Sequence, residues 1–319
     1  MQSRISLFLL RRRILTLSNQ LQFSGIRYKV HRTAVRMSGI VDNAHASTRR
    51  RVSQLTSMDG KVVLITGATA GIGESCAWAF AAHNSKLIIA GRRGEILAKL
   101  QKEIQEEYPA VKVHCCVLDV SNTDAVAALP EQLPEEFRNV DVLVNNAGCA
   151  LGLSTVATND IAFGAEMMNT NVMGVIAMTR AFLPGMMERN RGHVINMGSI
   201  ASSQAYGLGS MYCGSKFAVS GFTQCAQHDL TASPVRMTLI SPGLVGNTEF
   251  SNVRFSGDKT KADAVYESIV ALHPDDVADN VVYAATRPAH VQIADIKMYC
   301  TNQSGPRDLS RVGPSLGAK

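Results

Sequence analysis

The sequence has no long apolar run, few aromatic residues and no paired-cysteine motif. A membrane-spanning helix needs about twenty consecutive apolar residues, and no stretch of the 319 residues supplies one, so we expect no membrane span. The seven cysteines form no CxxC pair and have no metal-ligand spacing with histidine, which argues against a metal site or a disulfide scaffold. Most of them lie inside apolar runs, so we expect reduced, buried cysteines.

Acidic residues are almost absent from the first 57 residues of the chain. Residues 1–57 hold ten arginines and Lys29 but only one acid, Asp42, a net charge of +10. The remaining residues hold 21 basic and 25 acidic side chains, a net charge of −4. The formal net charge of +6 therefore comes from the N-terminal segment, and the rest of the chain gives no reason to expect nucleic-acid binding.

The basic segment 1–57 is typical of a targeting sequence. Its short apolar runs, Ile5–Leu10 and Ile14–Leu17, are separated by three consecutive arginines, whereas a secretory signal needs an uninterrupted apolar stretch. We therefore expect a transit peptide and mitochondrial import. The alternatives are a basic extension with no targeting role, or translation from Met37 or Met58, which would leave the protein in the cytoplasm.

From Lys61 onward, short apolar runs alternate with helix-length amphipathic stretches. The runs are continuous, which predicts strands buried on both faces, and their alternation with helices predicts an α/β domain built on a parallel sheet. We expect this single domain to span residues 58–303 and residues 304–319 to form a loose tail, since Gly305 and Pro306 follow directly. The expected strands are Val62–Thr66, Leu87–Ala90, Val113–Leu118, Val142–Asn145, Val194–Met197, Met237–Ser241 and Val291–Met298, and the expected helices include 93–107, 160–189, 211–230 and 275–286.

A glycine-rich segment follows the first expected strand and precedes a helix that begins near Ile72. Its glycines have the spacing Gly-x-x-x-Gly-x-Gly, which lets the backbone turn tightly and approach a pyrophosphate at a helix N-terminus. Glycines also mark ordinary turns, but the strand–loop–helix context favours a phosphate-binding loop. The candidate cofactor-binding residues here are Gly67, Thr69, Ala70, Gly71 and Ile72.

The end of the second expected strand indicates which dinucleotide binds. About twenty residues past the glycine loop, an NAD-binding protein usually has an acid for the ribose 2′-hydroxyl. This chain has Arg92 and Arg93 there and no acid. Guanidinium groups bind a 2′-phosphate with paired hydrogen bonds, so we expect NADP. The alternative is that both arginines simply begin a solvated helix.

Three hydroxyl or amine side chains suggest acid–base chemistry. Tyr212 and Lys216 are four residues apart on an expected helix and share one face, and a nearby ammonium lowers the pKa of a phenol. Ser199 follows the fifth expected strand, where its hydroxyl would reach a substrate oxygen. Asn171 lies inside an expected helix, where Asn is disfavoured. Each of these residues taken alone has an ordinary structural explanation.

Taken together and in order, these motifs resemble the short-chain dehydrogenase/reductase family. The resemblance covers about Lys61 to Gln303 and implies a doubly wound Rossmann domain with a seven-stranded parallel sheet, assembled as a homotetramer. The motifs are Thr66–Gly73, Asn145–Gly148, Asn171, Ser199, Tyr212–Lys216 and Pro242-Gly243.

The resemblance also implies a role for each residue. Tyr212 is the general acid in reduction and the base in oxidation, Lys216 lowers its pKa and holds the nicotinamide ribose, and Ser199 orients the substrate oxygen. Asn171 supports a water that links Lys216 to solvent. Further cofactor-binding residues are Asp119 and Val120 at the adenine, Asn145 near the ribose, and Pro242, Gly243, Val245 and Thr248.

The segment Pro242–Phe255 is more specific. It resembles the NADP-dependent 3-hydroxy acid dehydrogenases, which are similar to serine and L-allo-threonine dehydrogenases. This implies that a small 3-hydroxy acid is oxidised to a 3-oxo acid or semialdehyde, and the reverse. Thr248 departs from the broader family pattern, since it stands three residues after Val245 and not two.

The substrate carboxylate needs a cationic partner, and Arg254 is the candidate, with an exposed loop arginine as the alternative. Two other functions share the same motifs. A carbonyl reductase acting on lipids, steroids or quinones differs only in its pocket, and the polar stretch 251–264 argues against it. A non-catalytic nucleotide-sensing protein would lack Tyr212, Lys216 or Ser199, and all three are present.

Overall fold

A single sheet of seven parallel strands forms the centre of the molecule. The computed structural model describes residues 55–311, so nearly all of the expected leader and the segment 312–319 lie outside the described residues. The strand order is β3-β2-β1-β4-β5-β6-β7, and the order reverses between β1 and β4, where open α/β sheets bind ligands. The strands are β1 Val62–Thr66, β2 Lys86–Gly91, β3 Val113–Val117, β4 Val140–Asn145, β5 His193–Met197, β6 Arg236–Pro242 and β7 Asp295–Met298.

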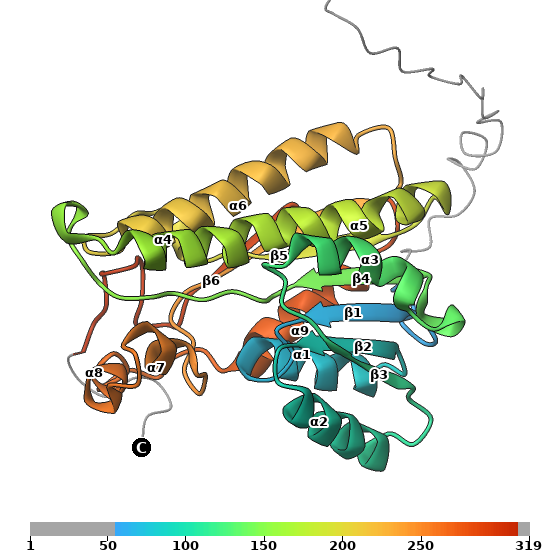
Figure 1. Ribbon diagram of the computed structural model, residues 1–319, viewed down its shortest axis with the longest axis horizontal. Coiled ribbons are helices and arrows are strands. Elements are labelled where there is room, and N and C mark those ends of the chain that lie inside the picture. The colour runs from blue at the N-terminus through green and yellow to red at the C-terminus, as the bar shows by residue number, and fades with distance from the viewer. Residues whose placement is uncertain (1–54, 312–319) are drawn as a thin grey trace, which may run out of the picture. The chain divides into compact units, whose positions relative to one another are not determined.

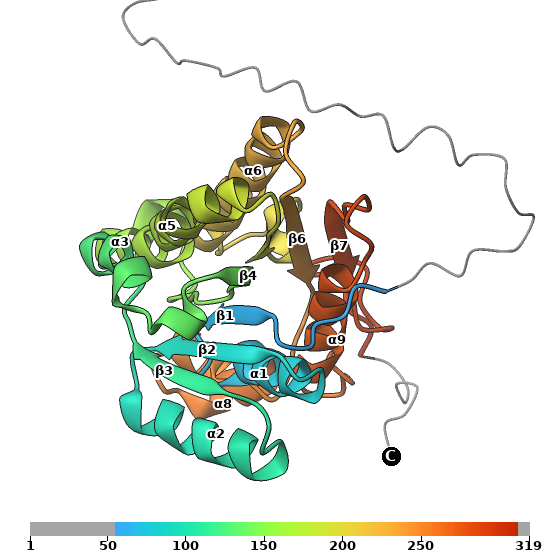
Figure 2. The same cartoon turned by 90° about the vertical axis from the view of Figure 1, so that its right-hand side faces the viewer.

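Helices cover both faces of the sheet, as the sequence predicts. Helices α1, α2 and α9 lie on one face, and α3, α5 and α6 lie on the other (Figures 1 and 2). The helices are α1 Gly71–Ala82, α2 Gly94–Glu107, α3 Thr123–Gln132, α4 Ile161–Met168, α5 Gly174–Glu188, α6 Ser210–Asp229, α7 Phe250–Arg254, α8 Lys259–Ala264 and α9 Pro274–Ala285. Short 3₁₀ turns occupy Glu135–Phe137, Val156–Thr158 and Ile200–Ser202, and the π-helical turn η3 spans Asn169–Met173.

The burial of β1 explains why the central strands are continuous apolar runs. Val63 and Ile65 pack into the core beneath α1 and α9, and Leu64, which points the opposite way, packs into the core on the other face. All five residues of β1 are buried. Successive side chains of a strand alternate between faces, so apolar residues are favoured at successive positions when helices cover both.

The two edge strands differ from this prediction. Most of β3 is only half-buried and Val117 at its end is exposed. The last strand, β7, is shorter than expected and alternates between exposed and half-buried residues. An edge strand has one neighbour and incomplete helix cover, so the expectation of burial on both faces is wrong for these two strands.

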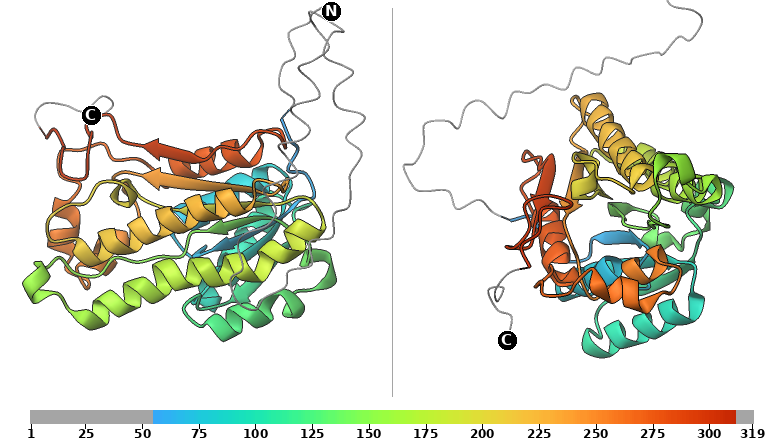
Figure 3. Two further views of the ribbon diagram at one scale, coloured as in Figure 1. Left: turned by 90° about the horizontal axis from the view of Figure 1, so that it is seen from above. Right: turned by 90° about the vertical axis from the view of Figure 1, so that its left-hand side faces the viewer.

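Two helical regions also depart from the expectation. The stretch expected as one helix over 160–189 is divided by η3, which places Asn171 and Val172 toward the interior. Helix α3 is not among the helices named from the sequence; Pro130 lies inside it, and Asn122 caps its N-terminus by accepting from the Ala125 amide. The α4–η3–α5 stretch lies beside α6 (Figures 1 and 3). No helix among residues 55–311 is long and apolar enough to span a membrane.

The chain after Gln303 is ordered where the structure describes it. Gln303 forms an antiparallel bridge with Leu309, the Ser310 amide donates to Asn302 (2.9 Å), and Arg307 donates to the carbonyl of Gly207 (3.0 Å). Arg311 donates to the carbonyl of Val265 (2.9 Å). The expectation of a loose tail is therefore wrong for residues 304–311, because backbone and arginine contacts hold this segment against the domain.

The cysteines are less uniformly buried than expected. All seven are free thiols, but only Cys76, Cys213 and Cys300 are fully buried. Cys225 is exposed on α6, and the remaining three are half-buried. The prediction of reduced cysteines is therefore matched in the structure, and the prediction that they are all buried is wrong.

Candidate active site

A cavity of about 900 Å³ opens beyond the carboxyl ends of strands β1 to β6. Its lining comes from the loop after each of these strands and from the start of α6. Parallel strands place their carboxyl ends at one edge of the sheet, so residues far apart in sequence meet there. The volume is in the range of small-molecule and cofactor sites.

The glycine loop at one end of the cavity is tightly packed. Gly67 has φ +65° and Gly71 has φ +57°, a backbone region that favours glycine. A Cβ on Gly73 would lie 2.3 Å from the carbonyl oxygen of Gly67. The Asn146 amide group donates to the carbonyls of Thr66 (2.9 Å) and Gly67 (3.2 Å), which fixes the loop against the end of β4.

The N-terminus of α1 behind this loop has free backbone donors. Ala70 occupies the N-cap position and makes no side-chain cap hydrogen bond. The first N–H groups of a helix have no partner within it and favour an anion. The loop therefore fits the pyrophosphate of a dinucleotide, since it lines the cavity and is followed directly by the N-terminus of a helix.

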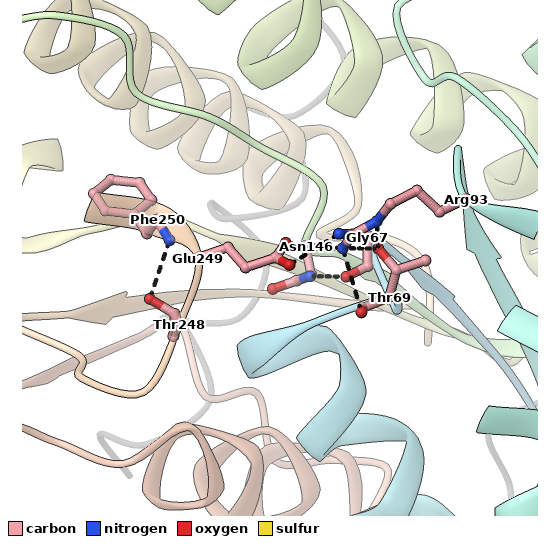
Figure 4. A network of polar contacts seen from close by, with 7 residues as sticks. All are labelled: Gly67, Thr69, Arg93, Asn146, Thr248, Glu249 and Phe250. Atoms are coloured by element: carbon pink, nitrogen blue, oxygen red, sulfur yellow. Dashed lines mark hydrogen bonds and ion pairs between the residues drawn. The ribbon is translucent and has the colours of Figure 1, made fainter. Parts of the chain in front are cut away.

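The two arginines after β2 differ in their contacts. Arg93 donates to both carboxylate oxygens of Glu249 (2.9 and 2.8 Å) and to the side chain and carbonyl of Thr69 (2.8 and 3.3 Å; Figure 4). Arg92 is exposed and makes no hydrogen bond or ion pair with any described residue. Glu249 was not anticipated from the sequence, because a single glutamate in a loop carries no motif.

Asp119 lies beside these arginines at the end of β3. It accepts hydrogen bonds from the Ser121 amide (2.9 Å) and hydroxyl (2.7 Å). Partial burial raises the pKa of Asp119, but the Ser121 hydrogen bonds and the charge of Arg92 outweigh it and hold the pKa below its usual value. Asp119 is therefore an ionised acceptor that lines the cavity.

Tyr212 and Lys216 lie on the first turns of α6, at the other end of the cavity. Both are nearly buried, with 9% and 6% of their surface exposed. The Lys216 ammonium donates to the carbonyl of Met197 (2.8 Å) and lies 6.0 Å from the centre of the Tyr212 ring. Burial lowers the pKa of Lys216 to about 8.

Burial raises the pKa of Tyr212 to about 12. Among the groups that oppose this rise, the charge of Arg254 comes first, followed by a hydrogen bond with Ser199. Lys216, which the sequence predicts to control this pKa, is not among the groups that shift it, and Arg254 is the cation that lowers it. The phenol stays protonated at neutral pH, which suits a proton donor.

Arg254 reaches this end of the cavity from α7. Its guanidinium lies 5.0 Å from the Tyr212 ring centre and 4.9 Å from the Phe250 ring centre. It donates to the Tyr206 hydroxyl (3.1 Å), and its buried Nε has no hydrogen-bond partner. A buried, unsatisfied donor is costly, and no described residue uses this donor beside the Tyr212 ring.

Asn171 is a buried residue that is hydrogen-bonded to Cys149 in the cavity wall. It is 1% exposed. Its Oδ1 accepts from the Cys149 amide (2.8 Å), while Nδ2 donates to the Cys149 carbonyl (2.8 Å) and to the Ser215 hydroxyl (3.0 Å). The π turn η3 directs the side chain inward, where it joins the loop after β4 to α6. Asn171 therefore does not line the cavity in this structure.

Asn145 is placed differently from the expectation. It is 2% exposed and donates to Asn196 Oδ1 (2.9 Å) and Thr179 Oγ1 (3.2 Å). These contacts lie within the sheet and its covering helix, so the expectation that Asn145 lines the cofactor site is wrong. Its neighbour Asn146 lines the cavity in its place.

All of the other predicted residues line the cavity, although they come from five different loops and from α6. Those that line it are Gly67, Thr69, Ala70, Gly71, Ile72, Arg92, Arg93, Asp119, Val120, Ser199, Tyr212, Lys216, Pro242, Gly243, Val245, Thr248 and Arg254. Thr248 packs on the glycine loop, since a Cβ on Gly71 would lie 3.0 Å from its methyl group. Within residues 55–311, no cluster of His, Cys, Asp or Glu side chains could hold a metal ion.

Comparison with known proteins identifies the family. The family model described as short chain dehydrogenase matches residues 61–259. The chain is 46% identical over 243 residues to a protein from Salmonella typhi named NADP-dependent 3-hydroxy acid dehydrogenase YdfG, covering 76% of this chain and 96% of the relative. It is 42% identical over 258 residues to an NADP-dependent 3-hydroxy acid dehydrogenase from Schizosaccharomyces pombe, covering 81% of this chain and 99% of the relative.

A solved structure is similar over the same region. It is described as the closed form of serine dehydrogenase complexed with NADP+. The two chains are 44% identical, with a TM-score of 0.73, and the match covers 76% of this chain and 96% of the other. The family model, the two relatives and the sheet order agree with the resemblance inferred from the motifs. The chain belongs to the short chain dehydrogenase family.

Proposed function

We propose that this protein is an NADP-dependent oxidoreductase that interconverts a small 3-hydroxy acid and its 3-oxo acid or semialdehyde. The dependence on NADP agrees with the names of both relatives and with the NADP+ complex of the similar structure. It also agrees with the two arginines and the absence of an acid at the end of β2. The choice of a carboxylated substrate depends on one observation, the position of Arg254.

Arg254 has the chemistry that an acid substrate needs. Its guanidinium lies 5.0 Å from the ring centre of Tyr212, and its Nε is a buried donor without a partner. In a 3-hydroxy acid the carboxylate is separated from the reacting carbon by one carbon. A substrate with its oxygen at the Tyr212 hydroxyl would therefore place its carboxylate near Arg254, where a charge-assisted hydrogen bond favours it.

Several residues of the protein contribute to the reaction. When bound, NADP supplies or accepts the hydride. The Tyr212 hydroxyl donates a proton to the carbonyl oxygen in reduction and takes it back in oxidation, while the Ser199 hydroxyl orients that oxygen. Lys216 and Arg254 place two positive charges near the phenol, which stabilise the phenolate that oxidation requires. The protein therefore contributes orientation and proton transfer.

The substrate range tests this proposal. Reduction of NADP and of NAD should be followed by absorbance with L-serine, L-allo-threonine, 3-hydroxyisobutyrate, 3-hydroxypropionate and neutral alcohols of the same length. We expect turnover of at least one 3-hydroxy acid with NADP and much weaker turnover of the neutral alcohols. Turnover of the neutral alcohols alone, or of quinones and steroids in the reverse direction, would contradict the proposal in favour of a carbonyl reductase.

We also propose that the protein assembles as a homotetramer. Exposed apolar side chains lie on α4, η3 and α6, which contact one another, namely Ile161, Met168, Met173 and Phe217. Apolar surface of this kind is covered in stable oligomers. Sedimentation velocity of the purified protein should give the mass of four chains, and a monomer at micromolar concentration would contradict this.

We further propose that residues 1–57 direct the protein to mitochondria. The support is the arginine-rich, acid-poor composition of this segment alone. A fluorescent protein fused to residues 1–57 should colocalise with a mitochondrial marker. A diffuse cytosolic signal would contradict the proposal and favour translation from Met37 or Met58.

A further inference from the structure

The guanidinium of Arg93 has both of its paired-donor edges occupied. Nη1 and Nη2 donate to the two carboxylate oxygens of Glu249, at 2.9 and 2.8 Å. Nε and Nη2 donate to the Thr69 hydroxyl, at 3.3 and 2.8 Å, and Nη2 also reaches the Thr69 carbonyl at 3.3 Å. A guanidinium has five N–H donors, and four of these are used. Arg93 therefore has no free pair of N–H donors with which to bind a phosphate.

Arg92, in contrast, has none of its guanidinium donors occupied by a described residue. Its side chain is exposed, it lines the same cavity, and it has no hydrogen-bond or ion-pair partner between residues 55 and 311. Its charge acts on Asp119 at the adenine end. A cation with all of its donors free is the better partner for the ribose 2′-phosphate.

The Arg93–Glu249 pair joins two parts of the cavity wall that are far apart in sequence. Thr69 belongs to the glycine loop after β1, and Glu249 belongs to the segment that leads from β6 into α7 (Figure 4). Arg93 comes from the end of β2 and contacts both. Thr248, next to Glu249, packs against Gly71 in the same glycine loop.

We propose that the two arginines have separate roles, and that Arg92 alone provides the main contact with the 2′-phosphate of NADP. Arg93 and Glu249 form a clasp, defined here as the contacts of Arg93 with Thr69 and Glu249, that holds the glycine loop against the α7 segment. Glu249 is thus a positioning residue for the cofactor. The inference depends on NADP as the cofactor and not on the identity of the substrate.

The two roles predict different dependence on the cofactor. Loss of Arg92 removes charge-assisted hydrogen bonds to a group that NAD lacks, so it should weaken NADP binding about 10- to 100-fold and leave NAD binding unchanged. Loss of the clasp makes both loops more mobile in the protein without cofactor. The free-energy cost of ordering them on binding then weakens the binding of NADP and NAD by the same factor. Because Arg93 and Glu249 are 42% and 53% exposed, this effect should be only about two- to fivefold.

Binding measurements without substrate test this proposal independently of the substrate assignment. Dissociation constants for NADPH and NADH should be measured by cofactor fluorescence for the wild type, Arg92→Gln, Arg93→Gln, Glu249→Gln and the Arg93→Gln/Glu249→Gln double variant. Glu106→Gln is the matched control, since Glu106 forms an exposed ion pair with Lys102 on α2 (3.7 Å). Melting temperatures verify that each variant is folded.

We expect Arg92→Gln to lower the preference for NADPH over NADH, and Arg93→Gln and Glu249→Gln to weaken both cofactors by one common factor. The double variant should be no weaker than either single variant, and Glu106→Gln should match the wild type. Three results would overturn the proposal. These are loss of the NADPH preference in Arg93→Gln, tighter NADPH binding in Glu249→Gln with NADH unchanged, and additive effects in the double variant.

Discussion

Arg254→Gln is the substitution that best separates recognition of the substrate from the chemistry at Tyr212. Glutamine is a shorter polar side chain, and it removes the positive charge and the guanidinium edge. In the structure this edge lies against the Tyr212 ring and carries the unpartnered Nε. The substitution therefore acts on two features, namely the binding of a carboxylate and the pKa of the phenol.

The magnitude follows from the contacts that are lost. A hydrogen bond to a charged group contributes about 1.5–3 kcal/mol, so kcat/KM for a 3-hydroxy acid should fall about 10- to 150-fold. A neutral alcohol has no carboxylate to lose this contact and should be affected much less. Since Arg254 is first among the groups that lower the pKa of Tyr212, its removal raises that pKa and moves the oxidation profile of both substrates to higher pH.

The assay compares kcat/KM for a 3-hydroxy acid and for a neutral alcohol of equal length, each as a function of pH. Tyr206→Phe is the companion variant, because it removes only the hydroxyl that accepts from Arg254 (3.1 Å) and keeps the charge. We expect the loss of kcat/KM in Tyr206→Phe to be smaller than in Arg254→Gln and to affect mostly the 3-hydroxy acid. An equal loss for both substrates in Arg254→Gln would refute the assignment of Arg254 to the carboxylate.

Three further substitutions test the packing of the glycine loop and of the sheet. Gly73→Ala should lower stability by about 1–3 kcal/mol and weaken NADPH binding, because its Cβ would lie 2.3 Å from the Gly67 carbonyl oxygen; thermal melts and fluorescence titration measure both, and wild-type values would contradict the loop geometry. Burial holds the pKa of His193 well below its ordinary value, so unfolding takes up a proton and stability should fall as the pH drops below about 6.5. His193→Gln should flatten this dependence in urea titrations, and an unchanged slope would contradict it. Arg236→Met removes the buried guanidinium that donates to the carbonyls of Ala284 and Ala285, so the melting temperature should drop by several degrees, unlike that of Arg180→Met, the control at an exposed position.

The fold was predictable where a local pattern determines the structure. Val62–Thr66 was predicted with the bounds that the structure shows, because helices on both faces require an unbroken apolar strand. The edge strand β7 was poorly predicted, and helix α3 was not among the helices named from the sequence. Burial of an edge strand depends on neighbours that the local sequence does not show. Helix α3 contains Pro130, a residue that is disfavoured inside helices, although Asn122 caps its N-terminus.

The site was predictable where a motif carries the chemistry. Ser199, Tyr212 and Lys216 were all identified from type and spacing, and they line one cavity. Contacts between distant residues were not predictable in this way. Nothing near Arg93 in the sequence points to Glu249, 156 positions away, and nothing near Asn145 shows that its side chain turns to Asn196 and not to the cavity.

The role of Tyr212 as proton donor and acceptor is the centre of this account, and one variant tests it directly. Tyr212→Phe keeps the ring that packs against Phe250 (5.7 Å) and removes only the hydroxyl. NADPH binding, measured by fluorescence, should stay within about twofold of the wild type, whereas kcat for the best 3-hydroxy acid should fall by at least about 10²-fold, the usual contribution of a positioned acid or base. A Tyr212→Phe enzyme that binds NADPH normally and still turns over near the wild-type rate would contradict the account.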